Sequence, residues 1–259
     1  NTADNFFSTI TVGNKEIIQL LYEGIGYSFL KTIEMSKVFI MTGNGRNGKS
    51  TLLDLIREIV GLQNATTLDF KELGKDFGTG GLAGKLVSLA GDISDQRIDD
   101  SDVFKKIASG DLVRVNQKYK EQYDIIPFTT LWFSANKIPP SNDKTYAFYR
   151  RLCIIPLDAN LKSISKRDGM IFHKQLLADE SREYVAYKAV KAIHNVLTNT
   201  YDFIEPQVVK DELESYRVSN SSTLQWCRYR RLTEVYNESG HDLYSEYESW
   251  CDMNIRKPY

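Results

Sequence analysis

The sequence has 259 residues, of which 42% are hydrophobic and 12% are aromatic, enough for one substantial core with smaller appendages. Its 33 Lys and Arg residues are balanced by 34 Asp and Glu residues, so the total charge does not indicate a nucleic-acid-binding protein and any DNA contact has to be local. Cys153, Cys227 and Cys251 are far apart and form no CxxC pair, which argues against a disulfide framework or a zinc site. A reducing, cytoplasmic location fits this pattern best.

No apolar run approaches the ~20 residues that cross a bilayer, and the first residues lack the charged and apolar regions of a signal peptide. The sequence therefore predicts a soluble protein with no membrane partner. Because the chain begins at Asn1 instead of a methionine, we expect it to be cut from a longer protein.

The first part of the chain predicts a helix, a buried strand and a second helix. Apolar residues recur at helical spacing between residues 15 and 30, and the continuous apolar run at residues 38–41 is typical of a strand buried on both faces. The strand leads into the glycine-rich stretch GNGRNGKS at residues 43–50. A second helical face follows from Leu52 to Val60, and Gly61 can end that helix in a left-handed conformation.

Further strands are predicted at residues 86–90, 130–134 and 152–157, separated by segments long enough for crossover connections. This order predicts an α/β fold, a sheet flanked by helices. Beyond Leu157 the periodicity becomes helical. We divide the chain into an N-terminal helical segment (1–36), a core (37–160), a helical segment (161–218) and the start of a truncated C-terminal small domain (219–259).

The glycine-rich stretch matches the pattern GxxxxGK[ST], and its position between a strand and a helix is the one expected of a P-loop NTPase. Backbone N–H groups of such a loop cradle the β-phosphate, the lysine reaches the β- and γ-phosphates, and the hydroxyl binds Mg²⁺. We therefore predict ATP and Mg²⁺ as cofactors. The residues predicted to bind the nucleotide are Gly43, Asn44, Gly45, Arg46, Asn47, Gly48, Lys49, Ser50 and Thr51.

Polar residues at other strand ends are candidates for the remaining catalytic roles. Asp92 follows the strand at residues 86–90 and could hold Mg²⁺ together with Ser50, although an Asp is also common in turns. Asn136 follows the next strand and could orient the attacking water, or could simply be a turn residue before two prolines. Arg150 and Arg151 precede the last strand, and either could be an arginine finger or an exposed charge at a strand edge.

Residues 103–124 carry five basic side chains against three acidic ones, a local excess in a chain with a net charge of −1. Alternation at residues 112–116 and 118–120 suggests a two-stranded ribbon with its tip near residues 117–120. Such tips are usually solvated loops. The family resemblance described next implies a ring, in which several copies would concentrate positive charge in one pore, and on that basis Lys118, Lys120 and Tyr119 are predicted to contact single-stranded DNA.

These motifs, taken in order, resemble the superfamily 3 helicases, in the branch of phage and plasmid primase-helicases and their poxvirus-like relatives. The similar stretches are GNGRNGKST at residues 43–51, LAGKLV running into GDIS at 82–94, the basic ribbon, LWFSAN at 131–136, and RRL running into IPL at 150–157. Residues 243–251 also resemble a segment near the C-terminal small domain of that family.

The resemblance implies an AAA+-like P-loop fold and an ATP-dependent DNA helicase that works as a homo-oligomeric, hexameric ring moving 3′ to 5′. It also implies a primase or polymerase domain upstream. Two features depart from the family. Gly91 precedes a single acid, Asp92, where many members carry adjacent acids, so Asp95 is the reserve candidate. The chain also stops at Tyr259, where relatives continue.

Other functional classes fit less well. A GTPase would need an NKxD motif, but Asn136 and Lys137 are followed by Ile138 and Pro139. No LSGGQ-like sequence of a transporter ATPase occurs. A small-molecule kinase stays open, because P-loops also serve phosphoryl acceptors. The main alternative is a loader or initiator that uses ATP to assemble on DNA without unwinding it.

Overall fold

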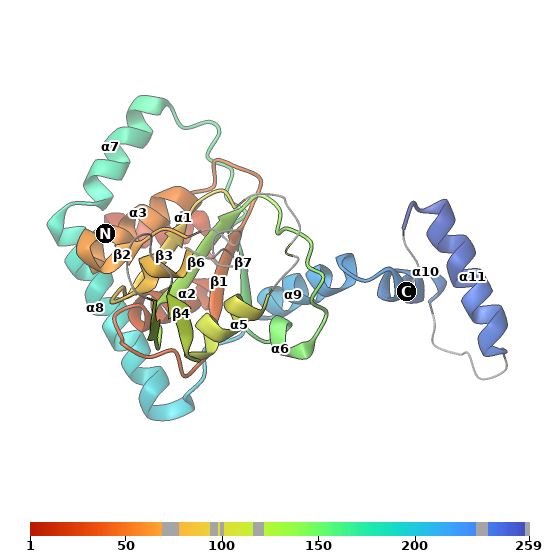
Figure 1. The fold of residues 1–259 in the computed structure, drawn as a ribbon. Helices are drawn as coiled ribbons and strands as arrows, with labels where there is room; N and C mark the ends of the chain where they lie inside the picture. Colours follow the sequence, from red (N-terminus) through yellow and green to blue (C-terminus); the bar gives the residue numbers. More distant parts are fainter. Residues whose placement is uncertain (69–77, 94–97, 99–100, 116–121, 232–237, 257–259) are drawn as a thin grey trace.

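A parallel β-sheet lies at the centre of the protein (Figure 1). The computed structural model describes residues 1–68, 78–93, 98, 101–115, 122–231 and 238–256. In this part of the chain, five strands pair in the order β2-β3-β6-β1-β7, with every pairing parallel. The strands are β1 (Val38–Thr42), β2 (Ala65–Thr66), β3 (Val87–Ala90), β6 (Thr130–Ala135) and β7 (Leu152–Pro156).

Successive residues of a strand point to opposite sides of the sheet, so a strand made of a continuous apolar run supplies apolar side chains to both faces. In β1, Phe39 and Met41 join one hydrophobic core, whereas Val38 and Ile40 join the other, and all four are fully buried. The uninterrupted apolar run of the sequence thus serves two cores. The prediction of a strand buried on both faces is confirmed.

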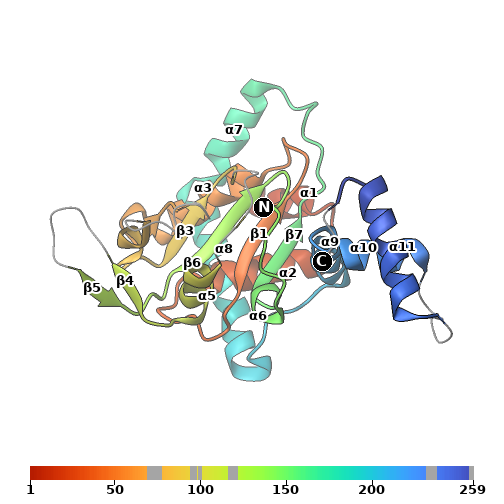
Figure 2. The same cartoon turned by 45° about the vertical axis from the view of Figure 1, so that its right-hand side comes forward.

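Four helices pack on the face formed by Phe39 and Met41: α1 (Thr2–Ile10), α2 (Lys15–Tyr27), α3 (Lys49–Val60) and α8 (Asp179–Asn195). Asn14 begins α2, and its side-chain oxygen accepts hydrogen bonds from the backbone N–H groups of Glu16 and Ile17. The helix α7 (Lys166–Leu176) extends from the upper rim of this layer in both ribbon views (Figures 1 and 2).

The other face is covered by α5 (Asp102–Ser109), α6 (Tyr146–Tyr149) and the C-terminal part of α9 (Gln207–Ser219). Asp143, in the connection between β6 and α6, accepts hydrogen bonds from Ser101, Lys105 and Thr145. Burial alone would raise the pKa of Asp143, but these hydrogen bonds outweigh it and hold the pKa well below its ordinary value. Asp143 therefore fastens α5 to the chain that follows Asn136.

A two-stranded antiparallel hairpin follows α5 and extends away from the sheet (Figure 2). It consists of β4 (Val113–Val115) and β5 (Tyr123–Ile125), and Arg114 pairs with Asp124 across it at 3.0 Å. The predicted two-stranded ribbon is present, and its two strands lie on either side of the predicted tip near residues 117–120. The hairpin tip at residues 116–121, with Lys118, Tyr119 and Lys120, lies outside the described residues.

The last two helices, α10 (Ser222–Arg230) and α11 (Gly240–Met253), lie away from the sheet and have a small core of their own (Figure 1). Its buried members are Trp226, Tyr247, Trp250 and Cys251.

The predicted α/β arrangement agrees with the structure, with the predicted strands within one residue of β3, β6 and β7. The helix α1 lies in the segment 1–36 predicted to be helical but was not named as a separate helix, although Ala3, Phe6, Phe7 and Ile10 have helical spacing and are all buried. Among the helices in the described residues, none has the length and apolar character needed to cross a membrane.

Candidate functional site

The carboxyl ends of three neighbouring strands meet at one edge of the sheet. The glycine loop at residues 43–48 follows β1, Asn136 follows β6, and Asp92 follows β3 by two residues, with β6 paired between the other two strands. Parallel topology therefore brings together groups that are separated by more than forty residues in the sequence. The carboxyl ends of parallel strands are where α/β proteins bind ligands.

The glycine loop needs backbone conformations that other residues rarely adopt. Gly43, Gly45 and Gly48 have φ values of +154°, +81° and +89°. A Cβ atom on Gly43 would lie 1.7 Å from Nδ2 of Asn47, so the loop has no space for a side chain there. Gly48 also caps α3 without a side chain, which leaves the first N–H groups of this helix open to a ligand.

Lys49 is held in place by oxygen atoms from three sides. Its amine donates hydrogen bonds to the Gly43 carbonyl at 2.7 Å, to Oδ1 of Asn47 at 3.0 Å and to Oδ1 of Asn136 at 3.1 Å. Burial lowers the pKa of this amine, and the nearby Asp92 carboxylate acts in the opposite direction. The amine is thus positioned before any ligand arrives, and Asn136 joins the loop through it.

Asp92 lines the same cavity as Lys49 and Ser50 and is exposed. It adopts a left-handed conformation with φ of +49°, which is uncommon for a residue other than glycine and is tolerated best by Asn and Asp. The Ser50 hydroxyl at the start of α3 and this carboxylate are hard oxygen ligands of the kind that Mg²⁺ prefers. Asp95 lies outside the described residues.

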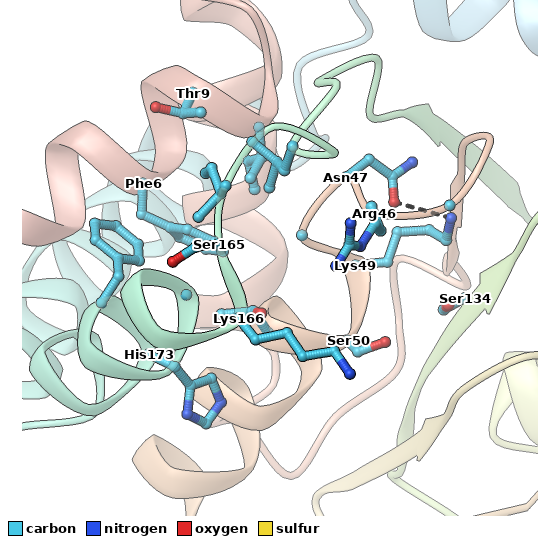
Figure 3. A pocket seen from close by; sticks show the side chains of 18 of the residues that line it. Phe6, Thr9, Arg46, Asn47, Lys49, Ser50, Ser134, Ser165, Lys166 and His173 are labelled. Atoms are coloured by element: carbon cyan, nitrogen blue, oxygen red, sulfur yellow. Dashed lines mark hydrogen bonds between the residues drawn. The ribbon is translucent and has the colours of Figure 1, made fainter.

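The site opens into a cavity of about 590 Å³ (Figure 3). One wall is the glycine loop and the strand ends, including the buried Ser134. The opposite wall comes from α1 and from residues 161–173, which include α7. Phe6, Thr9, Lys166 and His173 lie on this second wall, and the Lys166 side chain extends towards Ser50 (Figure 3).

Sequence reasoning missed the second wall entirely. The helical spacing of Phe6 and Ile10 could have revealed α1, but nothing in the sequence places this helix beside the glycine loop. The contact is tertiary: a Cβ atom on Gly48 would lie 2.5 Å from Cγ2 of Ile10. Lys166, a cation that lines the cavity opposite the loop, carried no recognisable motif either.

Arg150 and Arg151 lie far from their own glycine loop. In the pairing of β1 with β7, Val38 is opposite Leu152 and Thr42 is opposite Pro156, so both arginines are at the end of the sheet away from Lys49. Arg150 is exposed. Arg151 is buried, and its guanidinium donates hydrogen bonds to the Ser109 hydroxyl and the Ala147 carbonyl. Burial, followed by the charge of Arg150, lowers the pKa of Arg151.

Basic side chains also lie at the end of α10. Arg228 pairs with Glu214 at 3.2 Å, and Arg230 pairs with Glu246 at 3.0 Å. Arg231 ends α10 in a left-handed conformation. Arg228 and Arg230 are therefore engaged with carboxylates of the same chain.

Comparison with known proteins gave matches at the level of a family and of the fold. A model of a family of unknown function (DUF5906) matches residues 41–151, the stretch that contains the glycine loop, Asp92 and Asn136. No curated protein matches the chain.

Among solved structures, the A-form apo structure of the C-terminal region of NrS-1 is similar, with a TM-score of 0.63 at 14% identity. The alignment covers 96% of this chain and 61% of that chain. An apo structure of the same region (305–718) gives a TM-score of 0.61 at 14% identity, covering 96% and 62%. The chain therefore spans about three fifths of the length of these structures and shares their fold.

Proposed function

We propose that the chain is an ATP-hydrolysing P-loop motor, the helicase part of a phage- or plasmid-type replication protein that works on DNA as a hexameric ring. One observation carries this proposal: the Lys49 amine is held by Gly43, Asn47 and Asn136 at the mouth of an uncapped helix, in a cavity that Asp92 also lines. A cation, free N–H groups and a carboxylate around one cavity are the groups that phosphoryl transfer needs.

Each side chain then has a role. The loop N–H groups and Lys49 bind the β- and γ-phosphates, and Ser50 with Asp92 holds Mg²⁺, directly or through water. The metal would supply charge stabilisation at the phosphate oxygens. Asn136, already bonded to Lys49 at 3.1 Å, lies where its amide can orient the attacking water. The fold similarity to the C-terminal region of NrS-1 is compatible with this assignment but does not carry it.

The position of the arginines supports a site completed by a neighbouring subunit. The five residues of β1 separate Arg150 from its own glycine loop, a span of about 16 Å for a strand rising ~3.3 Å per residue. The Arg151 guanidinium already donates hydrogen bonds to Ser109 and Ala147 of its own chain. We therefore assign the arginine finger to Arg150, acting on the nucleotide of the next subunit.

The DNA contact rests on the hairpin. The strands β4 and β5 extend from the body of the protein (Figure 2), and the sequence between them contains Lys118, Tyr119 and Lys120, whose part in DNA binding stays a prediction. The alternative function, a loader or initiator that assembles on DNA without unwinding it, uses the same nucleotide site and the same hairpin. The two functions differ only in whether ATP hydrolysis leads to unwinding of duplex DNA.

The decisive experiment measures ATP hydrolysis with and without single-stranded DNA, together with unwinding of a tailed duplex. We expect hydrolysis that DNA stimulates, and its loss in Lys49→Ala with an unchanged circular dichroism spectrum. Lys210→Ala, an exposed lysine on α9, is the matched control and should hydrolyse normally. Full hydrolysis by folded Lys49→Ala would contradict the site. DNA-stimulated hydrolysis without unwinding would favour the loader.

A further inference from the structure

A second cavity borders the nucleotide cavity on the side of Asp92. It measures about 370 Å³, shares Ser50 with the first cavity, and is also lined by Gly91, the residue before Asp92. Its apolar lining includes Leu89, which is mostly buried, and Leu62, which is 75% exposed. The proposed phosphate chemistry uses Ser50 and leaves the rest of this second cavity without a role.

The helix α6 presents an aromatic side chain next to the proposed arginine finger. Tyr146 is 82% exposed, and the Arg150 N–H donates to the Tyr146 carbonyl at 2.9 Å, so the two residues are one helical turn apart. Side chains at this spacing lie on the same face of a helix. The other side of α6 is fixed to the core by the buried Phe148 and Tyr149. Tyr146 and Arg150 are therefore held together on one firmly mounted, exposed surface.

The second cavity and α6 lie at opposite edges of the sheet. The strands β2 and β3 contribute to the cavity and are at one end of the strand order, whereas α6 leads into β7 at the other end (Figure 1). A contact between two different surfaces of the same chain joins copies head to tail, and it repeats from copy to copy until a ring closes. Surfaces at opposite edges are placed for such a contact, so the partner that they fit is a second copy of this chain.

We propose that Tyr146 of one subunit inserts into the second cavity of the next subunit and thereby places Arg150 beside the nucleotide there. This inference rests on the proposed function, since it takes Arg150 as the finger of the neighbouring site. The second cavity adjoins the metal-binding Ser50 on a side that α1 and α7 do not form, which leaves it open to a neighbour. Tyrosine buries a large ring at a small loss of conformational freedom and is enriched among the residues that dominate interfaces.

The polar groups of the two surfaces are complementary. The Thr66 side chain belongs to the lining of the second cavity and offers a hydrogen-bonding partner to a phenol hydroxyl. The exposed Lys144 and Arg150 bring positive charge to the α6 surface, and Asp92 and the phosphates of a bound nucleotide bring negative charge to the other. Tyr146 therefore supplies the apolar anchor of a contact whose charged groups attract each other.

Cross-linking between subunits tests the contact directly. Tyr146→Cys and Leu62→Cys place one thiol on each surface, in a Cys227→Ser background because Cys153 and Cys251 are already buried. Mixed and treated with a short bismaleimide, the two variants should give a covalent dimer that neither gives alone. A chain with both substitutions should give a ladder of larger species, because head-to-tail contacts continue from subunit to subunit.

The matched control for the cross-link is Tyr187→Cys, which makes the same exchange at a tyrosine of α8 that is 64% exposed. Mixed with Leu62→Cys, it should run as a monomer on a denaturing gel. A dimer as abundant in this control as with Tyr146→Cys would overturn the docking. The absence of a dimer with Tyr146→Cys at every protein concentration would overturn it as well.

Tyr146→Ala separates docking from catalysis. It should fold, because the side chain is exposed, and it should raise the protein concentration of half-maximal ATPase activity about tenfold or more. Arg150→Ala should instead lower the maximum, and Tyr187→Ala should change neither. An unchanged concentration dependence in Tyr146→Ala would contradict the docking. If the unaltered protein hydrolyses no ATP, the proposed function fails, and the cross-link still decides whether Tyr146 docks on a neighbour.

Discussion

Asn47 is the residue that joins the glycine loop to the rest of the sheet. It is almost fully buried, its Nδ2 donates to the Leu157 carbonyl at 2.8 Å, and its Oδ1 accepts from Lys49 at 3.0 Å. One amide thus positions the lysine and ties the loop to the residue after β7. A buried amide with both ends satisfied fixes geometry at small energetic cost, because neither polar atom loses its partners.

The role of Asp92 can be tested without disturbing its unusual backbone. Asn tolerates the left-handed conformation at least as well as Asp, so Asp92→Asn should fold normally and remove only the charge. We expect this variant to bind Mg²⁺-ATP while its turnover falls by about 10² or more, the scale of a lost general base or metal ligand. The experiment measures ATP hydrolysis and Mg²⁺-ATP binding separately, and we expect hydrolysis to be lost while binding is retained.

Asp95 provides the comparison for that experiment. If Asp92→Asn turns over normally and Asp95→Asn does not, the catalytic carboxylate is Asp95. Normal turnover in both variants would remove the carboxylate from the mechanism altogether. The net charge changes equally in the two variants, so a general electrostatic effect cannot produce a difference between them.

For individual residues, the sequence predicted the candidate side chains of the nucleotide site but not all of the residues that contact them. Lys49, Ser50, Asp92 and Asn136 were named from motif order, and the structure brings them to one cavity because parallel strands end at one edge. The choice between Arg150 and Arg151 could not be predicted. It depends on Ser109, a residue of α5 that is 42 positions away and meets Arg151 only in the folded chain.

Among the elements, α2 and α8 approach each other most closely at Gly26. A Cβ atom on this glycine would lie 2.3 Å from the Ala189 carbonyl oxygen and 2.8 Å from Cβ of Ile193. Backbone cannot move aside as a flexible side chain can, so Gly26→Ala should lower the free energy of unfolding by about 2–3 kcal/mol. Urea unfolding followed by circular dichroism measures this difference.

Gly169→Ala is the matched control for that prediction, since it makes the same change inside a helix where the added methyl has space. It should leave stability unchanged or raise it by up to about 1 kcal/mol, because Ala favours the helix more than Gly does. A Gly26→Ala protein as stable as the Gly169→Ala protein would mean that α2 and α8 are not packed as closely as described.

Most elements were predictable because hydrophobic periodicity is a local property. The strands β1, β3, β6 and β7 were read from apolar runs, and the helices on either side from their spacing. The order in which the strands pair was not predictable, since β6 enters between β1 and β3 only through long-range packing such as Trp132 stacked on Phe39. The strand at Tyr123–Ile125 was not named from the sequence because its residues are largely exposed and carry a weak apolar pattern.

For the whole molecule, the separation of Arg150 from Lys49 predicts activity that depends on association. Arg150→Ala should fold, because its side chain is exposed, and should lose about 10³-fold or more in turnover. Lys49→Ala should be inactive for a different reason, because it removes the phosphate-binding amine from its own subunit. Mixing the two variants should restore part of the activity, because some interfaces then pair an intact loop with an intact arginine. ATPase assays across protein concentration measure this.

Arg151 must be left unchanged in the mixing experiment. Its guanidinium joins α5 to α6 through hydrogen bonds to Ser109 and Ala147. An Arg151 variant could therefore lose activity through a disturbed fold, and this loss could not be told apart from the loss of an arginine finger. If the mixture is as inactive as either variant, and if the specific activity of the unaltered protein does not rise with concentration, Arg150 has no role in a neighbour's site.

The strand β7 has one further consequence. Arg150 lies two residues before its first residue, and the carbonyl of Leu157, just after its last, accepts the hydrogen bond from Asn47 beside Lys49. If Arg150 acts on the neighbour's nucleotide as proposed, this one strand would connect the nucleotide site of its own subunit with that of the next. In a ring every such strand points the same way around the circle. The state of the nucleotide in one subunit would then affect the site of one neighbour and not of the other. The subunits would therefore hydrolyse ATP in a fixed order around the ring.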